Sequence, residues 1–227
     1  MKTTPVTDHL TQLTKLHFVN AFLVREEDGF TLVDTTLGRG AGALIAAARR
    51  AGAPIRRIAL THGHGDHIGS LDALRERLGT EVEVSIGDLD ERILAGETEG
   101  KFPGSWPTVR TRADRRLVAG DRVGSLEVVP TPGHTPGHVA FVDTRDRSVI
   151  AGDTFTAYGR LMTSDRLRLP FPLAASATWD GAQVLESART VRALAPSVMV
   201  VGHGPVVREP LARIDKALAL AGTPVAA

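Results

Sequence analysis

Residues 61–67 read Thr-His-Gly-His-Gly-Asp-His and decide how this chain folds and what it binds. They follow a short apolar run, Arg57–Leu60, that is typical of a buried strand. In a helix these three histidines and the aspartate would point all around the axis, and in a strand His67 would point away from the others. The two glycines instead favour a tight loop in which all four side chains converge. We therefore expect a functional site in a loop directly after this strand.

Further residues with metal-binding side chains recur in the same setting along the chain. Each follows a glycine just beyond the C-terminal end of a predicted strand: His134 after Leu126–Val129, Asp153 after Ser148–Ala151, and His203 after Val198–Val201. Without a shared role, such residues would have to occur by chance at four separate strand ends. The sequence therefore predicts one site built from the ends of four strands.

The composition restricts the chemistry of that site. The chain has 227 residues, no cysteine, and a formal net charge of +1. The missing cysteine excludes disulfides, a thiol nucleophile and thiolate-bound metals, so any metal must be held by histidine and carboxylate. The length suits a single domain over residues 1–227, and the near-neutral charge gives no reason to expect a nucleic-acid or membrane partner. We expect a small-molecule substrate, and the oligomeric state cannot be inferred.

The predicted metal centre has a ligand set large enough for two ions. Its members are imidazoles and carboxylates: His62, His64, Asp66, His67, His134, Asp153 and His203. Such ligands suit zinc, and they also suit manganese, iron or cobalt. Asp153 has two oxygens and is able to bridge the ions, which would lie ~3.5–4 Å apart and share a water whose pKa falls toward ~7. This arrangement supplies hydroxide without a nucleophilic side chain.

Two further residues are candidates for supporting that centre. Asp34 ends the predicted strand Phe30–Val33, and we interpret it as a carboxylate that orients a ligand histidine, with a turn residue as the alternative. His138 either faces the edge of the site or pins the turn Thr135–Gly137 by a hydrogen bond, and the structural role is favoured. The remaining histidines, His9 and His17, are expected to be ordinary residues.

Short apolar runs alternate with helical patterns along the chain. The predicted strands are Leu16–Val24, Phe30–Val33, Arg57–Leu60, Glu81–Ile86, Asp121–Val123, Leu126–Val129, His138–Asp143, Ser148–Ala151 and Val198–Val201. Helices are predicted over Ala41–Arg50, after Ser70 as N-cap, around Val184–Leu194, and from Pro210. Two sheets with helices outside would accommodate this order. The N-terminus has no signal-peptide pattern and no segment is a membrane span, so we expect a cytoplasmic protein.

The motif His62-x-His64-x-Asp66-His67, followed by His134, Asp153 and His203, resembles that of the metallo-β-lactamase superfamily. The resemblance implies an α/β fold, an αββα sandwich of two mixed sheets with the metals between the sheet edges. It implies that one metal takes His62, His64 and His134, and that the other takes Asp66, His67 and His203, with Asp153 bridging. Asp34 matches the family's supporting aspartate, and Asp66 is expected to orient the bridging hydroxide and to carry a proton to the leaving group.

The resemblance implies a metallo-hydrolase but leaves its substrate open, because members cleave several kinds of bond. We expect attack on an ester, lactone or thioester carbonyl. The alternatives are β-lactamase-like amide, phosphodiester or sulfur-compound hydrolysis on the same site, or a metal-binding protein without activity. The short segment after His203 has no room for the helical domain of glyoxalase II-type enzymes, which argues against a glutathione thioester.

Tyr158 is the only tyrosine in the chain and is a candidate catalytic residue. Similar lactonases carry a tyrosine three positions after the bridging aspartate, where this chain has Thr156, so Tyr158 is either an oxyanion partner or loop packing. The apolar segment Thr156–Leu173 suggests an uncharged or acyl-bearing substrate, with ordinary packing onto the sandwich as the alternative. The arginine-rich segment Glu97–Arg116 is either a lid that holds an anion or, more often for such a run, a solvated surface.

Overall fold

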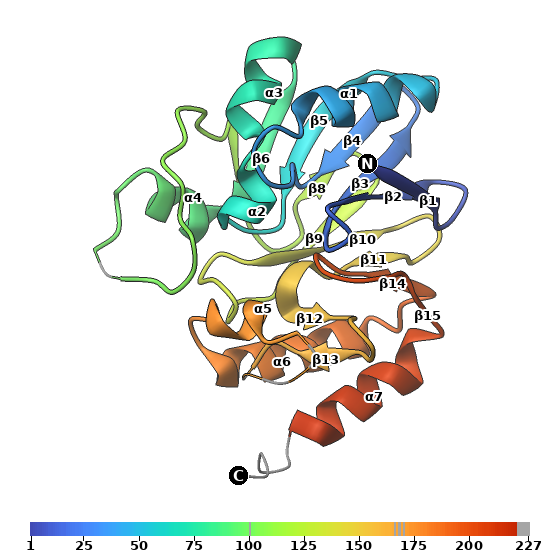
Figure 1. Cartoon of the computed structure of the whole chain (residues 1–227), viewed down its shortest axis with the longest axis vertical. Coiled ribbons are helices and arrows are strands. Elements are labelled where there is room, and N and C mark those ends of the chain that lie inside the picture. Colours follow the sequence, from blue (N-terminus) through green and yellow to red (C-terminus); the bar gives the residue numbers. More distant parts are fainter. Residues whose placement is uncertain (100, 166, 168, 170, 222–227) are drawn as a thin grey trace.

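A computed structural model describes residues 1–99, 101–165, 167, 169 and 171–221 of the chain. Two β-sheets pack face to face, and helices cover the outer face of each, which confirms the predicted αββα sandwich (Figure 1). The layers follow from the sequence pattern, because strands that are apolar on both faces must be covered on both sides.

The first sheet comes from the N-terminal half of the chain. Its strands lie in sequence order: β1 (Lys2–Pro5), β2 (Leu10–Lys15), β3 (Val19–Glu26), β4 (Gly29–Val33), β5 (Ile55–Leu60), β6 (Glu83–Gly87) and β7 (Arg115–Leu117). The neighbours from β1 to β4 are antiparallel, and those from β4 to β7 are parallel. The parallel strands are joined by helices, as crossovers between parallel strands require.

The second sheet comes from the C-terminal half. Its order is β15 (Val207–Arg208), β14 (Val198–Val200), β11 (Val149–Ile150), β10 (Val139–Asp143), β9 (Leu126–Pro130) and β8 (Arg122–Val123). Only the β11–β14 pair is parallel among these described strands, so this sheet is also mixed. A separate short ribbon pairs β12 (Phe155–Thr156) with β13 (Met162–Thr163).

Buried side chains form three layers of apolar packing. Between the sheets, Phe22 and Val33 of the first sheet pack with Phe141 and Val200 of the second. The outer face of the first sheet is covered by α1 (Ala41–Arg50) and α3 (Leu71–Leu78), and that of the second by α6 (Gly181–Ala193) and α7 (Pro210–Ala221). The described chain also contains short helices: α2 (Gly65–Ile68), α4 (Asp88–Leu94) and α5 (Leu173–Ser176).

Several elements differ from their predictions. The helix Ala41–Arg50 agrees to the residue, whereas β1, β2, β7 and α4 were not predicted. The expected loop after β5 turns into the one-turn helix α2 at Gly65. Ser70 precedes α3 but does not cap it, because its hydroxyl donates to the Leu37 carbonyl and accepts from the Gly40 amide. Among the described residues, no helix combines the length and apolar character needed to span a membrane.

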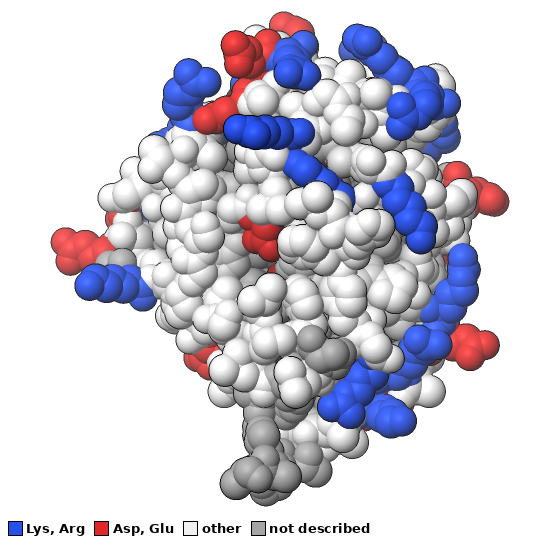
Figure 2. Space-filling model, in the orientation of Figure 1, with Lys and Arg blue, Asp and Glu red and all other residues white. Residues whose placement is uncertain are grey.

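The connections that follow β4, β5, β9, β11 and β14 carry the predicted site residues, so both sheets contribute to one edge of the sandwich. The face shown in Figure 2 has most of its Lys and Arg side chains toward the periphery. Its middle is largely uncharged, apart from acidic atoms recessed in a hollow. Charge is therefore sparse on this face except at the periphery and at one central depression.

Candidate metal centre

All of the predicted ligand side chains meet at the edge between the two sheets. Their ligand atoms form overlapping groups, within each of which all the atoms lie within 4.8 Å of one another: His62 with His64 and His134, His62 with His67 and Asp153, and Asp66 with His67 and His203. Six of the seven side chains are buried, and Asp66 is partly exposed. The distances suit a metal centre built from nitrogen and oxygen donors.

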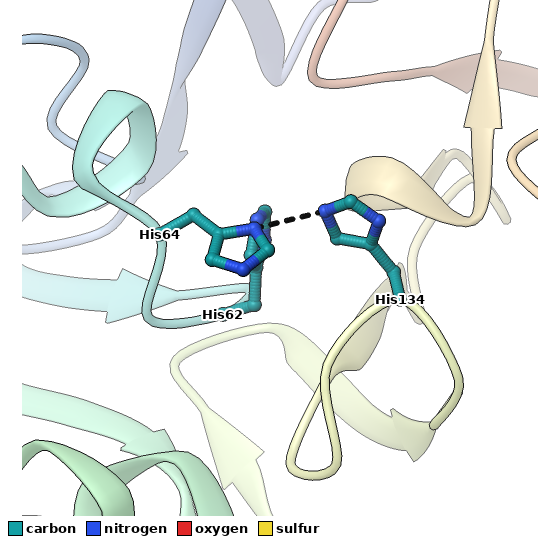
Figure 3. A group of neighbouring side chains, drawn as sticks. All are labelled: His62, His64 and His134. Carbon is teal, nitrogen blue, oxygen red and sulfur yellow. Dashed lines mark hydrogen bonds between the residues drawn. The ribbon is translucent and has the colours of Figure 1, made fainter. Parts of the chain in front are cut away.

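The first group joins the loop after β5 to the loop after β9. His64 Nδ1 lies 3.0 Å from His134 Nε2, and the His62 ring stands edge-on to both imidazoles (Figure 3). His62 and His64 come from the first sheet, whereas His134 comes from the second. Three imidazole nitrogens at such distances would supply three of the four donors that a tetrahedral metal site takes.

The second group lies beside the first and contains the carboxylates. His203 Nε2 lies 3.2 Å from Asp66 Oδ2 and 3.1 Å from Asp153 Oδ2. The other Asp153 oxygen lies 3.5 Å from His67 Nε2, and Asp153 Oδ2 also lies 3.5 Å from His134 Nε2. Asp153 is thus placed between the two groups, as a bridging carboxylate must be.

The outer nitrogen of each histidine faces a hydrogen-bond acceptor. His67 Nδ1 lies 2.8 Å from Asp34 Oδ2, and His203 Nδ1 lies 2.9 Å from the Phe18 carbonyl. The others pair with the Thr61 hydroxyl for His62, the Pro103 carbonyl for His64, and the Thr178 hydroxyl for His134. A ring nitrogen opposite an acceptor carries the hydrogen, so the inner nitrogen of each neutral ring presents a lone pair to the centre.

Several inner atoms are buried without a hydrogen-bond partner among the described residues. They include His62 Nε2, His67 Nε2 and Asp153 Oδ1. A buried polar atom left unpaired costs free energy, so a cluster of them needs a missing partner. Divalent metal ions are the partner that imidazole lone pairs and carboxylate oxygens share. The residues present therefore fit a metal centre.

Burial and the carboxylates divide the histidines into two electrostatic classes. Burial lowers the pKa of His62, His64 and His134, so these rings are neutral. Burial also acts to lower the pKa of His67 and His203, but nearby carboxylates outweigh it, raising the pKa of His67 well above its ordinary value and that of His203 to about 10. In the metal-free protein, protons therefore occupy the carboxylate-rich half of the site.

Asp34 and His138 lie behind the ligands. Asp34 is fully buried and also accepts from the Thr61 backbone and hydroxyl, which links it to both His62 and His67. His138 accepts from the Asp153 backbone amide at 3.0 Å, and its Nδ1 lies 2.8 Å from the Thr131 hydroxyl. His138 therefore supports Asp153, whereas its side chain forms no hydrogen bond with the turn Thr135–Gly137.

A glycine leaves room for the bridging carboxylate. Gly202 precedes His203, and a Cβ at this position would overlap with the Asp153 carboxylate and with the His67 ring. The sequence pattern of a glycine before each ligand thus has a steric reason at this position, because only glycine permits such close approach of the backbone.

A small cavity of about 70 Å³ opens over the centre. Its lining combines ligand side chains with apolar residues from the segments around them: Phe18, Phe171, Leu173, Ala174 and Ala177. Neither Lys nor Arg is among the described residues that line it. On the other side, the half-buried Trp106 ring packs edge-on to His64, and Phe102 lies between Trp106 and Trp179. The approach to the centre is therefore apolar and aromatic.

Tyr158 is not among the residues that line this cavity. Its hydroxyl donates to the His17 carbonyl at 2.6 Å, and its ring packs on Phe171, which in turn packs on His203. The structure therefore places the tyrosine behind one wall of the cavity, with its hydroxyl already engaged. A direct catalytic role for Tyr158 stays a prediction.

The segment between α4 and β7 contributes to the site through its backbone. The Ser105 carbonyl accepts from the Gly65 amide, and the Pro103 carbonyl faces His64. The arginines that follow pair with surface carboxylates or a carbonyl: Arg110 with Asp72, Arg112 with the Val109 carbonyl, Arg115 with Asp121, Arg116 with Glu97, and Arg122 with Glu127. These arginines form a solvated surface, and the alternative of an anion-holding lid is not supported.

Some contributors to the site were not found by sequence reasoning. The Phe18 and Pro103 carbonyls and the Thr178 hydroxyl hold ligand rings. A carbonyl carries no residue-specific signal, since every residue has one. Asp90 is also missed, although it is buried and hydrogen-bonded to both ligand loops of the first group.

Comparisons with known proteins agree with this geometry. The family model of the metallo-β-lactamase superfamily matches residues 14–203. The uncharacterized protein YobT of Bacillus subtilis is 39% identical over 217 residues, which cover 92% of this chain and 93% of that protein. A hydroxyacylglutathione hydrolase of Rhodopseudomonas palustris is 33% identical over 123 residues, 52% of this chain but only 41% of that enzyme.

Solved structures show the same architecture. TTHA1623, solved in a di-iron-bound form, is 28% identical with a TM-score of 0.64, over 88% of this chain and 94% of that one. A metallo-β-lactamase from Pontibacter korlensis is 18% identical with a TM-score of 0.73, over 98% and 99% of the two chains, and shares the fold. Taken with the family match, these findings establish that the chain belongs to the metallo-β-lactamase superfamily.

Proposed function

We propose that this protein is a hydrolase with two metal ions, and that it cleaves an ester, lactone or thioester carbonyl. The observation that carries the proposal is the ligand cluster, in which every histidine has its outer nitrogen pinned to an acceptor and its inner nitrogen aimed at a common centre. Such preorganisation is what a metal site needs to hold its ions in one geometry.

The proposed ligands of one ion are His62, His64 and His134, and those of the other are Asp66, His67 and His203, with Asp153 shared. Zinc is the proposed metal, with iron, manganese or cobalt as alternatives, and the relative solved in a di-iron form supports iron among these. When bound, two such ions supply Lewis acidity and lower the pKa of a water to about 7.

The chain's own residues orient and protect that chemistry. Asp66 is the partly exposed carboxylate of the centre, and we assign to it the transfer of a proton to the leaving group. The apolar wall formed by Phe18, Phe171 and Leu173 excludes water from one side of the cavity. Buried histidines with fixed outer nitrogens keep their orientation while the substrate enters.

The cavity favours an uncharged carbonyl substrate over a phosphodiester. Phosphodiesters carry a charge that protein sites usually meet with Lys or Arg, and neither type is found in the described lining. The arginines of the neighbouring segment are engaged with surface carboxylates. An acyl group with an apolar side fits the exposed Leu173, which lines the cavity, and the exposed Trp179, whose backbone amide donates to the His134 carbonyl. The hydroxyacylglutathione hydrolase relative supports an acyl substrate, although the match spans under half of that enzyme.

Metal analysis joined to a substrate panel tests the proposal. The protein would be purified after expression with added zinc, its metal content measured, and its activity assayed on a p-nitrophenyl ester, a γ-lactone, an acyl thioester, a β-lactam and a phosphodiester. We expect about two metals per chain and the highest kcat/KM on one of the first three substrates. Fewer than one metal per chain would refute the dinuclear centre, and activity confined to the phosphodiester would refute the carbonyl assignment.

A further inference from the structure

Asp90 in α4 is a buried carboxylate that contacts both loops of the first ligand group. Its Oδ2 accepts from the Gly63 amide at 2.8 Å and from the Thr135 hydroxyl at 2.7 Å. Its Oδ1 accepts from the Gly137 amide at 2.7 Å. Both carboxylate oxygens thus accept hydrogen bonds, and each bond lies in the short range typical of an ionised group.

The donors lie on either side of the ligands. Gly63 stands between His62 and His64 in the loop after β5, and Thr135 directly follows His134 in the loop after β9. These loops belong to different sheets, and within the first ligand group they meet through the His134 ring, which contacts both His62 and His64. One carboxylate therefore holds the two loops at a set separation.

Packing around Asp90 is close enough to reinforce that separation. A Cβ at Gly137 would overlap with the backbone nitrogen and the side chain of Asp90, and a Cβ at Gly87 would overlap with the Gly137 carbonyl. The start of α4 and the loop after β9 thus approach each other without intervening side chains. Such packing transmits a small displacement of one segment to the other.

Asp90 is buried without a compensating charge. It forms no ion pair among the described residues, and burial raises its pKa to about 6, although its three hydrogen bonds act to lower it. A buried carboxylate without a cation is costly, and an amide or an apolar residue would avoid the cost. The feature that a carboxylate offers here is its ability to accept from three donors on two loops at once.

We propose that Asp90 is a positioning residue for the His62, His64 and His134 group, and that it sets the distance between the two loops that one metal ion requires. This inference rests on the proposed two-metal centre. Asp90 forms no hydrogen bond or ion pair with Asp66, His67 or His203, so its proposed effect is confined to one of the two metal sites.

The test measures zinc affinity with one metal site removed at a time. In a His203→Ala background, the remaining ion occupies the first group, and Asp90→Asn is expected to weaken its binding about tenfold, as changes behind metal ligands do. In a His62→Ala background, the remaining ion occupies the other group, and the same change is expected to leave its affinity unaltered. Calorimetric titration with zinc supplies both values without reference to activity.

Two matched variants accompany this test. Asp88→Asn removes a partly exposed carboxylate from the same helix and is expected to change neither affinity. Thr135→Val removes one donor while retaining Asp90 and both glycines, and is expected to weaken the first site alone by a few-fold. If Asp90→Asn does not fold, Thr135→Val still decides the question.

The outcomes separate the inference from the proposed function. Failure of the unaltered protein to bind two metals would overturn the proposed centre itself. If the unaltered protein binds two metals but Asp90→Asn weakens metal binding equally at both sites, Asp90 has a general structural role and the inference is overturned. Unchanged affinity at the first site would also overturn it.

Discussion

His67 Nδ1 lies 2.8 Å from Asp34 Oδ2, and both side chains are completely buried. Asp34 follows β4 and His67 lies in α2, so the contact ties two neighbouring strand ends of the first sheet. The same carboxylate accepts from the Thr61 hydroxyl, which faces His62 Nδ1. One residue thus orients a ligand of each proposed metal.

Replacing Asp34 with Asn tests this arrangement. The amide removes the charge behind His67 and offers a donor where acceptors are needed, so we expect metal affinity to fall about 10- to 100-fold. Calorimetric titration with zinc measures the change. Asp28→Asn is the matched control, because Asp28 is an exposed carboxylate that pairs with Arg57 beyond the other end of β4. Wild-type affinity in a folded Asp34→Asn protein would contradict the orienting role.

Loss of a ligand from either side of the centre should abolish hydrolysis. For His134→Ala and Asp66→Asn we expect kcat/KM to fall by at least about 10³, since each removes a group that positions or protonates the reacting atoms. Circular dichroism and thermal unfolding establish that the variants are folded. A folded variant with full activity on the best substrate of the panel would contradict the mechanism.

Metal uptake should release protons from the carboxylate-rich half of the site. In the metal-free protein at pH 7, His203, with a pKa of about 10, and His67, with a raised pKa, both carry protons that a metal must displace. Affinity at that site should therefore rise with pH, by up to about tenfold per unit for each proton displaced. Titrations in buffers of different ionisation enthalpy count the protons, and heats that do not depend on buffer would contradict this expectation.

The same shift predicts how the metal-free protein responds to alkali. The pKa of His203 is raised from 6.5 to about 10 on folding, so its stabilising contribution is complete below pH 6.5 and disappears as the pH rises through 10. Metal-free protein should therefore lose stability over this range, whereas metal-loaded protein should not. Urea unfolding at pH 6.5, 8 and 10 measures the free energy of unfolding of both forms. The same pH dependence in both forms would argue against protonated histidines in the metal-free site.

The exposed aromatic side chain next to His134 should determine preference among acyl groups. Trp179 is 41% exposed, its ring lies beside that of Phe102, and its backbone amide donates to the His134 carbonyl. Each acyl methylene buried there should contribute about 0.8 kcal/mol, or about a fourfold gain in kcat/KM. Trp179→Ala should flatten this dependence across p-nitrophenyl esters of increasing chain length and leave the acetate ester unchanged. Leu89→Ala removes an exposed apolar side chain from α4 and serves as the control.

Prediction from sequence succeeded where residues have a distinctive chemistry or a regular pattern. The helix Ala41–Arg50 is rich in alanine, and Gly52 and Pro54 follow it, which explains its agreement with α1. The ligand side chains were found because imidazole and carboxylate groups are recognisable at strand ends. The structure brings all of the proposed ligands together, including His203, which is far from the first motif in sequence.

The remaining features depend on tertiary contacts that leave no local signal. Strands β1 and β2 are rich in Lys, Thr and Gln, so their alternation is weak, and pairing with β3 stabilises them. Asp90 has the pattern of an ordinary acidic residue in the first turn of a helix. Its burial results from the approach of the loop after β9, which the sequence of α4 does not encode.

The ligands come from both layers of the sandwich: His62 to His67 from the first sheet, and His134, Asp153 and His203 from the second. Bound ions would therefore act as a further cross-link between two halves of the chain that are already joined by apolar packing and by hydrogen bonds such as those of Asp90 to the loop after β9. Any change that alters how the two sheets pack against each other, even one far from the centre, would cause a loss of bound metal. Metal content is thus a reporter of sheet docking, and metal removal is a way to loosen the sandwich from its edge.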